Sequence, residues 1–268
     1  MLTRFHKMQG LGNDFVVLDA RAEPIRISPA RAQALADRRT GVGCDQLIVI
    51  GASDKADVSM RIWNADGSEV EACGNATRCV PVLVGRNCSV ETAAGILTAN
   101  LAGEGATVDM GRPRFGWEDI PLGYAMDTSA MPLGWGILEH PAAVNMGNPH
   151  LVFFVPDIDT VPLADLGPTI EHDPLFPERI NVNVATVLDA GHVRMRTWER
   201  GAGLTLACGT GACATFAAGR RLGKLSNDVR IDLPGGTLLL TEDVHGHLLM
   251  SGPATYVFAG EIDLARFG

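Results

Sequence analysis

Two stretches of this chain resemble each other at a fixed separation of 135 residues, about half of its length. The segment Val58–Trp63 aligns with Val193–Trp198, and the same alignment places Ala72-Cys73-Gly74 on Ala207-Cys208-Gly209. Among the 18 positions from 58 to 75, 7 residues are identical to their counterparts, where chance would give roughly one. The repeat predicts two related halves that form matching walls of one cleft, each presenting a cysteine.

Length and charge place the chain among globular proteins that carry no nucleic acid. Its 268 residues can bury a core in one large domain or two ordinary ones, and the repeat favours two. With a net charge of −9, the chain is not expected to have the cationic surface that binding to nucleic-acid phosphates requires. Residues 1–7 lack the apolar core of a signal peptide, and no apolar run is long enough to span a bilayer. We therefore expect a cytoplasmic protein whose six cysteines are reduced thiols.

Alternating and β-branched segments predict a mixed, β-rich α/β fold, in which each half is a curved, barrel-like sheet around one helix. Strands are expected at 15–19, 46–50, 58–63, 95–101, 106–110, 150–155, 183–188, 192–198, 229–233, 237–241 and 256–260, and helices at 29–37, 75–85 and 210–222. Pro81 removes a backbone donor and is expected to kink or delay the second helix. Residues 111–143 are expected to connect the halves.

The paired cysteines each precede a glycine and a predicted helix. There a thiolate is favoured by the positive end of the helix dipole. The following N–H groups, of Gly74-Asn75 and Gly209-Thr210, are suited to hold a carboxylate. A lone cysteine is more often a small buried apolar residue, but two at matching positions of a repeat favour catalysis. Such a pair suits a reaction that needs one base on each face of a flat intermediate.

Metal and cofactor chemistry find little support in the sequence. Neither Cys73/Cys79 nor Cys208/Cys213 has the C-x2-C spacing of a zinc site or a nearby histidine. The glycine-rich stretches complete no nucleotide-binding loop. The three lysines lie outside the repeated motifs, which weakens a pyridoxal mechanism without excluding it. We expect no metal and no cofactor.

Amides recur at matched positions of the two halves. Asn13 aligns with Asn148 and Gln46 with Asn181, whereas Asn64 aligns with Glu199. Single asparagines are commonly turn residues, but matched ones favour a shared cleft that binds a zwitterion. Glu199-Arg200 is either a surface pair or a site for an ammonium and a second carboxylate, and His150 is either a core residue or a proton acceptor.

Six separated motifs resemble the diaminopimelate epimerase family over nearly the whole chain. They are Gly-Asn-Asp-Phe at 12–15, Asn-Ala-Asp-Gly-Ser-Glu at 64–69, Cys-Gly-Asn at 73–75, Met-Gly-Asn-Pro-His at 146–150, Glu-Arg-Gly at 199–201 and Ala-Cys-Gly-Thr-Gly-Ala at 207–212. The resemblance implies a cofactor-independent isomerase that converts LL-2,6-diaminopimelate to the meso form, in lysine and peptidoglycan synthesis. The chain departs from the usual family pattern at Ala76-Thr77 and Pro81.

The resemblance also implies an architecture and a set of roles. It implies domains at 1–114 and 115–254 with an interdomain active site, a last strand near 255–268 that returns to the first domain, and a homodimer. Cys73 and Cys208 would be the acid and base, tuned by His150 and Glu199. The substrate would be bound by Asn13, Gln46, Asn64, Gly74, Asn75, Asn148, Asn181, Glu199, Arg200, Gly209 and Thr210.

Three other functions stay open at this point. A proline racemase or hydroxyproline epimerase shares the two cysteines, but those relatives usually carry Cys-Gly-His at the first site, where Asn75 stands here. An isomerase of the phenazine-biosynthesis type shares the fold without the cysteine pair. A non-catalytic amino-acid-binding protein would keep the cleft alone.

Overall fold

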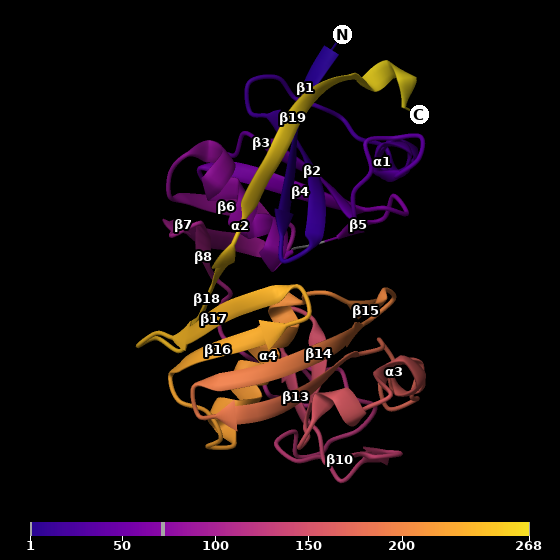
Figure 1. Cartoon of the computed structure of the whole chain (residues 1–268), viewed down its shortest axis with the longest axis vertical. Helices are drawn as coiled ribbons and strands as arrows, with labels where there is room; N and C mark the ends of the chain where they lie inside the picture. The colour runs from indigo at the N-terminus through magenta and orange to yellow at the C-terminus, as the bar shows by residue number, and fades with distance from the viewer. Residues whose placement is uncertain (1, 71–72, 268) are drawn as a thin grey trace. The chain divides into compact units, whose positions relative to one another are not determined.

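The chain forms two compact units, Met1–Asp109 with Ser251–Gly268, and Met110–Met250 (Figure 1). The computed structural model describes residues 2–70 and 73–267, so Ala72 of the repeated motif and Gly268 of the expected last strand lie outside the described residues. The chain crosses between the units twice, after Asp109 and after Met250.

The first unit is built on neighbouring strands that are far apart in the sequence. β1 (Leu2–Gly10) pairs antiparallel with both β2 (Asn13–Ala20) and the last strand, β19 (Thr255–Asp263). The ladder continues from β2 through β3 (Gln46–Gly51), β4 (Val58–Asn64), β6 (Cys88–Thr92) and β7 (Gly95–Ala102) to β8 (Gly105–Asp109). The short β5 (Glu69–Val70) forms a hairpin with β4.

The second unit repeats this pairing pattern. Its ladder runs through β11 (Ala142–Asn145), β12 (Pro149–Phe154), β13 (Asn181–Asp189), β14 (His192–Glu199), β16 (Asp228–Leu233) and β17 (Gly236–Glu242), with the hairpin strand β15 (Gly203–Thr205) on β14. The registers also match, because Phe15 pairs with Gln46 in one unit and His150 pairs with Asn181 in the other. The duplication read from the sequence is therefore present in the hydrogen bonding.

One helix in each unit begins directly after the repeated cysteine. α2 (Gly74–Val84) contacts β1 and β19 as well as β6, β7 and β8, so the sheet curves around it. α4 (Gly209–Arg221) likewise contacts β11, β12, β13 and β17. The expected mixed, β-rich fold with a central helix in each half is confirmed. α2 continues through Pro81 to its end at Gly85, which has the positive φ of 79° that favours glycine in a helix cap.

A second helix in each unit covers the other side of the sheet. α1 (Pro29–Ala36) is capped by Ser28, whose side chain accepts from the Arg31 N–H, as the sequence predicts. It packs on β3 and β4, so strands such as β2 are buried on both faces. Its counterpart α3 (Leu163–Glu171) packs on β13 and β14.

Several elements escape the sequence prediction. They are β1, β5, β6, β11, β15, α3, the 3-10 turns η1 (Ile158–Thr160) and η2 (Leu264–Arg266), the hairpin β9 (Gly134–Trp135) with β10 (Leu138–Glu139), and β18 (Leu248–Pro253), which pairs with β8. Most are short or rich in polar residues, so neither periodicity nor apolar length distinguishes them. Within the described residues, no helix has the length and apolar character needed to cross a membrane.

Gly167 of α3 provides a direct test of the packing of α3 on β14. A Cβ at Gly167 would lie 2.4 Å from the Trp198 ring, and the ring is held because its Nε1 donates to Glu171 Oε2 at 2.8 Å. We expect Gly167→Ala to lower the free energy of unfolding by about 1–3 kcal/mol. Urea denaturation followed by tryptophan fluorescence measures the change.

The control for this prediction is Ala164→Ser, at an exposed position of the same helix. It should change stability by less than about 0.5 kcal/mol. Equal stability of Gly167→Ala and the unmodified protein would contradict the packing described here.

Candidate functional site

Cys73 occupies the N-cap position of α2. Its backbone is extended (φ −145°, ψ 114°), and the helix begins at Gly74. The first N–H groups of a helix have no intrahelical acceptor and lie at the positive end of its dipole. The sequence therefore places the thiol beside the N–H groups of Gly74 and Asn75, at a helix end where negative charge is favoured.

Asn13 lies beside this thiol. Its Oδ1 accepts from Cys73 Sγ at 3.9 Å and from Asn75 Nδ2 at 3.4 Å. Asn75 Oδ1 in turn accepts from Arg78 Nη2 at 3.0 Å, and Arg78 is fully buried. The structure thus brings together three of the residues predicted for the first half of the site.

Two aspartates clamp the loops that carry Asn13 and Gln46. The Asp14 N–H donates to Asp45 Oδ2 and the Asp45 N–H donates to Asp14 Oδ1, both at 3.1 Å. Asp45 Oδ2 also accepts from Asn13 Nδ2 at 3.1 Å. Lys7 and Arg38 bind Asp14. Burial alone would raise the pKa of Asp14, but the hydrogen bonds from Arg38 and Lys7 hold it below its ordinary value.

Gln46 and Asn64 face each other across β3 and β4. Gln46 Nε2 donates to Asn64 Oδ1 at 3.0 Å, and the two residues are register partners. The structure therefore places two of the amides predicted for the site next to each other within the first unit.

Cys208 occupies the same N-cap position on α4. Its backbone is extended (φ −124°, ψ 108°), and its sulfur accepts from the Gly211 N–H at 3.3 Å. Thr210 Oγ1 lies 3.5 Å from the sulfur. Cys208 is only 3% exposed, so the second unit presents a more enclosed thiol at the same fold position.

Glu199 lies next to Cys208 and is half-buried. Burial first, and then the charge of Glu199, raise the pKa of the Cys208 thiol well above its ordinary value. Burial likewise raises the pKa of Glu199, although hydrogen bonds from Thr205 and Cys208 oppose the shift. Thr205 Oγ1 lies 2.6 Å from Glu199 Oε1. Each group therefore ionises less readily than it would in water, and a double negative charge here is disfavoured.

His150 is fully buried within an amide network. Asn183 Nδ2 donates to the Leu151 carbonyl at 2.8 Å, which fixes that amide and turns Nδ2 toward His150 Nδ1 at 3.2 Å. His150 Nδ1 is therefore the acceptor, and Nε2–H donates to Asn148 Oδ1 at 2.9 Å. Burial, and then the charge of Arg200, lower the pKa of His150 to about 3. The ring is neutral and orients Asn148.

Asn181 and Arg200 hold the turn after β14. Asn181 Nδ2 donates to the Pro149 carbonyl at 2.8 Å, and its Oδ1 accepts from the Arg200 N–H at 3.0 Å. The Arg200 guanidinium is exposed and donates to the Glu178 carbonyl at 2.8 Å. The buried Glu171 accepts from the Gly201 N–H at 3.0 Å. The second unit thus fixes the Glu199-Arg200 segment from both sides.

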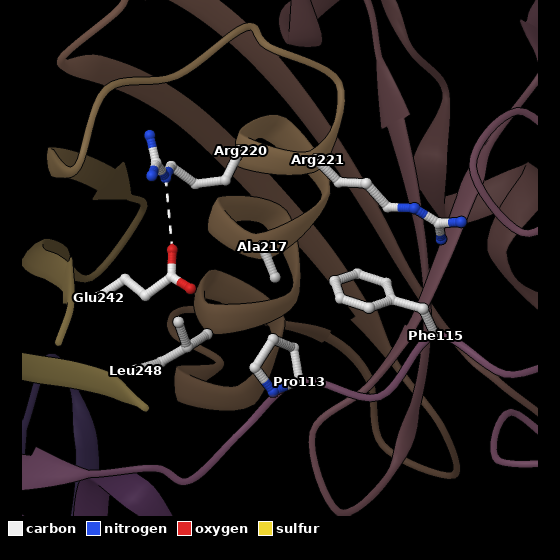
Figure 2. A pocket seen from close by; sticks show the side chains of 7 residues that line it. All are labelled: Pro113, Phe115, Ala217, Arg220, Arg221, Glu242 and Leu248. Carbon is white, nitrogen blue, oxygen red and sulfur yellow. Dashed lines mark ion pairs between the residues drawn. The ribbon is translucent and has the colours of Figure 1, made fainter. Parts of the chain in front are cut away.

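A cavity of about 260 Å³ in the second unit lies away from Cys208. It is lined by Pro113, Phe115, Ala217, Arg220, Arg221, Glu242 and Leu248 (Figure 2). Arg220 follows Cys208 by twelve residues, which is about 18 Å along a helix. Arg220 pairs with Glu242 at 3.5 Å, and Arg221 lies over the Phe115 ring at 4.8 Å from its centroid. Both arginine side chains thus already have partners within the protein, and we do not place the catalytic site in this cavity.

Several residues that build the half-sites escape sequence reasoning. Asn183 orients His150 and accepts from Thr197 Oγ1 at 3.0 Å. Glu171, Thr205 and Arg78 support the second and first halves as described above. The available signal was a polar residue inside an otherwise apolar strand, as for Asn183 between Val182 and Val184. Glu171 carries no such signal, because acidic residues are common at helix ends.

The fold is shared with crystal structures of small-molecule isomerases and their relatives. A hydroxyproline epimerase from Agrobacterium vitis superposes with a TM-score of 0.70 at 14% identity, over 97% of this chain and 91% of that one. A PhzF-family phenazine biosynthesis protein from Bacillus anthracis gives 0.68 at 18% identity, over 98% and 99%. At such identities the likeness concerns the fold alone.

Sequence comparison is more specific. The family model for diaminopimelate epimerase matches residues 5–116 and 142–257. A diaminopimelate epimerase of Zymomonas mobilis is 65% identical over the full length of both chains. One of Rhizorhabdus wittichii is 60% identical over 100% of this chain and 98% of its own. The chain belongs to the diaminopimelate epimerase family and is an isomerase, which confirms the resemblance read from the six motifs.

The protonation state of His150 can be measured directly. A pKa of about 3 in the folded protein, against an ordinary 6.5, means that the unfolded chain binds the proton more tightly. The free energy of unfolding should therefore fall as the pH drops from about 6.5 toward 3. Long-range 1H–15N spectra at pH 5 should show His150 as the neutral Nε2–H tautomer.

The same spectra of the protein in concentrated urea are the control. There His150 should titrate as an ordinary histidine. An imidazolium signal from His150 in the folded protein at pH 5 would refute the network described for it.

Proposed function

We propose that this chain interconverts LL- and meso-2,6-diaminopimelate in lysine and peptidoglycan biosynthesis, with Cys73 and Cys208 as a pair of bases and acids. The observation that carries the proposal is that the two thiols occupy the same N-cap position in two units with the same strand pairing and register. Membership of the family supplies the substrate class.

The chemistry asks for one thiolate and one thiol. An α-hydrogen of an amino acid is weakly acidic, so a well-placed base must remove it in a site that excludes water. One thiolate takes this proton, and the thiol on the other face delivers its own proton to the same carbon. Neither step changes an oxidation state. Afterwards the proton lies on the sulfur that acted as the base, and it must return to the other sulfur by exchange with solvent before another molecule of the same isomer reacts.

The surroundings of Cys208 favour its entry into the reaction as the thiol. Its burial and the nearby Glu199 both disfavour a thiolate there. Cys73 would then act as the base, with Asn13 beside its sulfur. The two sulfurs share one proton as a coupled pair, and the arrival of a substrate ammonium would offset the charge that builds up near Glu199.

The remaining predicted residues divide by their chemistry. The N–H groups of Gly74, Asn75, Gly209 and Thr210 would hold carboxylate oxygens at the two helix N-termini. The amides of Asn13, Gln46, Asn64, Asn148 and Asn181 would contact ammonium and carboxylate groups, together with Glu199 and Arg200. The network around His150 supports a role in which it orients Asn148.

Isotope incorporation tests the reaction. In deuterated water, we expect LL-diaminopimelate to gain deuterium at the α-carbon as that centre inverts, because the delivered proton comes from a solvent-exchanged thiol. L-proline and 4-hydroxyproline, incubated in parallel, should stay unlabelled. Mass spectrometry with chiral chromatography measures both. Labelling of proline alone would move the chain to the racemase activity, and labelling of no substrate would indicate a binding protein.

The catalytic pair is tested by single substitutions. Cys73→Ala and Cys208→Ala should each lower kcat/KM by at least about 10²–10⁴-fold, the usual contribution of a positioned acid or base. Cys213→Ala, at a buried cysteine of α4 outside the N-cap, is the matched control and should retain most activity. Near-normal turnover by either N-cap variant would refute the assignment.

We also propose that the protein is a cytoplasmic homodimer. The six cysteines, all among the described residues, are unbridged thiols, which suits a reducing compartment. Tyr256, Val257 and Phe258 of β19 are consecutive and exposed. Val257 lies at a register shift of the β1–β19 pairing, and a second copy of the chain would bury this exposed apolar group.

Sedimentation equilibrium tests the dimer. Val257→Glu, which places a charge among these apolar side chains, should weaken association at least tenfold. Val244→Glu, at a residue that is 95% exposed in a turn of the other unit, is the matched control and should leave association unchanged. A protein that sediments as a monomer before substitution would contradict the proposal.

A further inference from the structure

The loop between β4 and β5 contains a chain of hydrogen bonds whose direction is set by one carboxylate. Asp66 Oδ1 accepts from the Ser68 N–H at 2.8 Å and from Ser68 Oγ at 2.6 Å. These hydrogen bonds lower the pKa of Asp66, so the group is a carboxylate that can only accept. The Ser68 hydroxyl proton is therefore committed to Asp66.

The direction of this hydrogen bond determines the donor and acceptor in the next two hydrogen bonds, from Asn64 to Ser68 and from Gln46 to Asn64. With its proton directed to Asp66, Ser68 Oγ acts as the acceptor for Asn64 Nδ2 at 3.1 Å. Asn64 must then turn its Oδ1 the other way, where it accepts from Gln46 Nε2 at 3.0 Å. Side-chain amides can usually take either of two orientations, but in this chain each one is determined by its neighbour.

The chain ends on an unsatisfied acceptor. Gln46 Oε1 is buried and has no hydrogen-bond partner among the residues that the structure describes. Leaving a buried acceptor without a donor costs about 1–3 kcal/mol, so this oxygen is expected to meet a donor when the site is filled. It cannot rotate away to present Nε2 instead, because Asn64 would then face it with a second oxygen.

The backbone of the loop keeps the chain in place. The Asn64 N–H donates to the Ser68 carbonyl at 2.8 Å, and the Gly67 N–H donates to the Asn64 carbonyl at 3.0 Å. Gly67 has a φ of +85°, and a Cβ there would lie 2.4 Å from the Pro29 carbonyl oxygen. The turn is thus fixed against α1 and leaves Ser68 little freedom.

We propose that Asp66 and Ser68 are positioning residues that hold Gln46 with its oxygen toward the substrate, and that this oxygen accepts from a substrate ammonium group. The inference rests on the proposed function. In diaminopimelate only the ammonium groups donate hydrogen bonds, while both carboxylates only accept. An acceptor held in one orientation therefore selects an ammonium and repels a carboxylate.

The second unit lacks this device. The 135-residue offset places Gly201 at the position of Asp66 and Gly203 at that of Ser68. Glu199 replaces Asn64, and a hydroxyl from Thr205 contacts it. The hydrogen-bond chain is therefore present in the first unit and not in the second. This difference allows the first unit to recognise one particular ammonium group.

The test compares diaminopimelate with pimelate, which keeps both carboxylates and lacks both ammonium groups. Ser68→Ala frees Asn64 and Gln46 to turn over, so the KM for diaminopimelate should rise about tenfold, the loss expected for one hydrogen bond to a charged group. The inhibition constant of pimelate should stay within about twofold. Ser68→Thr, which keeps the hydroxyl, should restore the KM.

Ser59→Ala is the matched control, since Ser59 lies on β4 in the same unit and bonds the Ala52 carbonyl instead. It should leave both constants unchanged. Equal weakening of diaminopimelate and pimelate by Ser68→Ala would show a general structural role and overturn the proposal, as would an unchanged KM.

A measurement without substrate separates this proposal from the proposed function. In 1H–15N spectra of the ligand-free protein, the side-chain amides of Asn64 and Gln46 should shift in Ser68→Ala and return in Ser68→Thr. Unchanged amide signals in Ser68→Ala would overturn the hydrogen-bond chain even in an active enzyme. Absence of turnover in the unmodified protein would instead count against the proposed function.

Discussion

The structure depends on one constraint, the placement of a cysteine at the N-cap of a helix that lies inside a curved sheet. At that position the backbone is extended before the helix begins, as it is for Cys73 and Cys208. The thiol then lies beside the first N–H groups of the helix, which have no acceptor within the helix, and at the positive end of its dipole. Other features, including the buried strands and the amide-bearing loops, serve to hold this point rigidly in each unit.

Small differences between the repeats make the two half-sites chemically unequal. The position occupied by Phe15 in one unit carries His150 in the other, and Asn64 is replaced by Glu199. The first change introduces a neutral imidazole that directs Asn148. The second places a carboxyl group beside a buried thiol and disfavours its ionisation. Duplication thus provides the geometry, and substitution provides the difference between the two thiols that the proposed proton transfer uses.

The sequence was sufficient for the repeat, for most of the longer strands and for the cysteine-bearing helices, because each rests on local patterns. It was insufficient where long-range packing decides. The offset of 135 holds for Phe15–Gln46 and His150–Asn181, but after the helices it becomes 141, since Val90 and Ile231 occupy the same place beside β4 and β14. α4 and the connection after it are longer than their counterparts, so a fixed offset could not locate β6 or β18.

The sequence points to candidate contacting residues of the site but not to the residues that support them. The thiol of Cys73 and the amides of Asn13 and Gln46 are groups whose residue types suggest a role in catalysis or binding. Asp66 and Ser68 carry no such signal, because they lie in an exposed turn where aspartate and serine are common for local reasons. They matter because the Gln46 amide can present either a donor or an acceptor. The Asp66 carboxylate, three hydrogen bonds away, determines which of the two it presents. For a substrate whose two ends bear the same groups, such fixed polarity is the means by which one ammonium is recognised at a defined place.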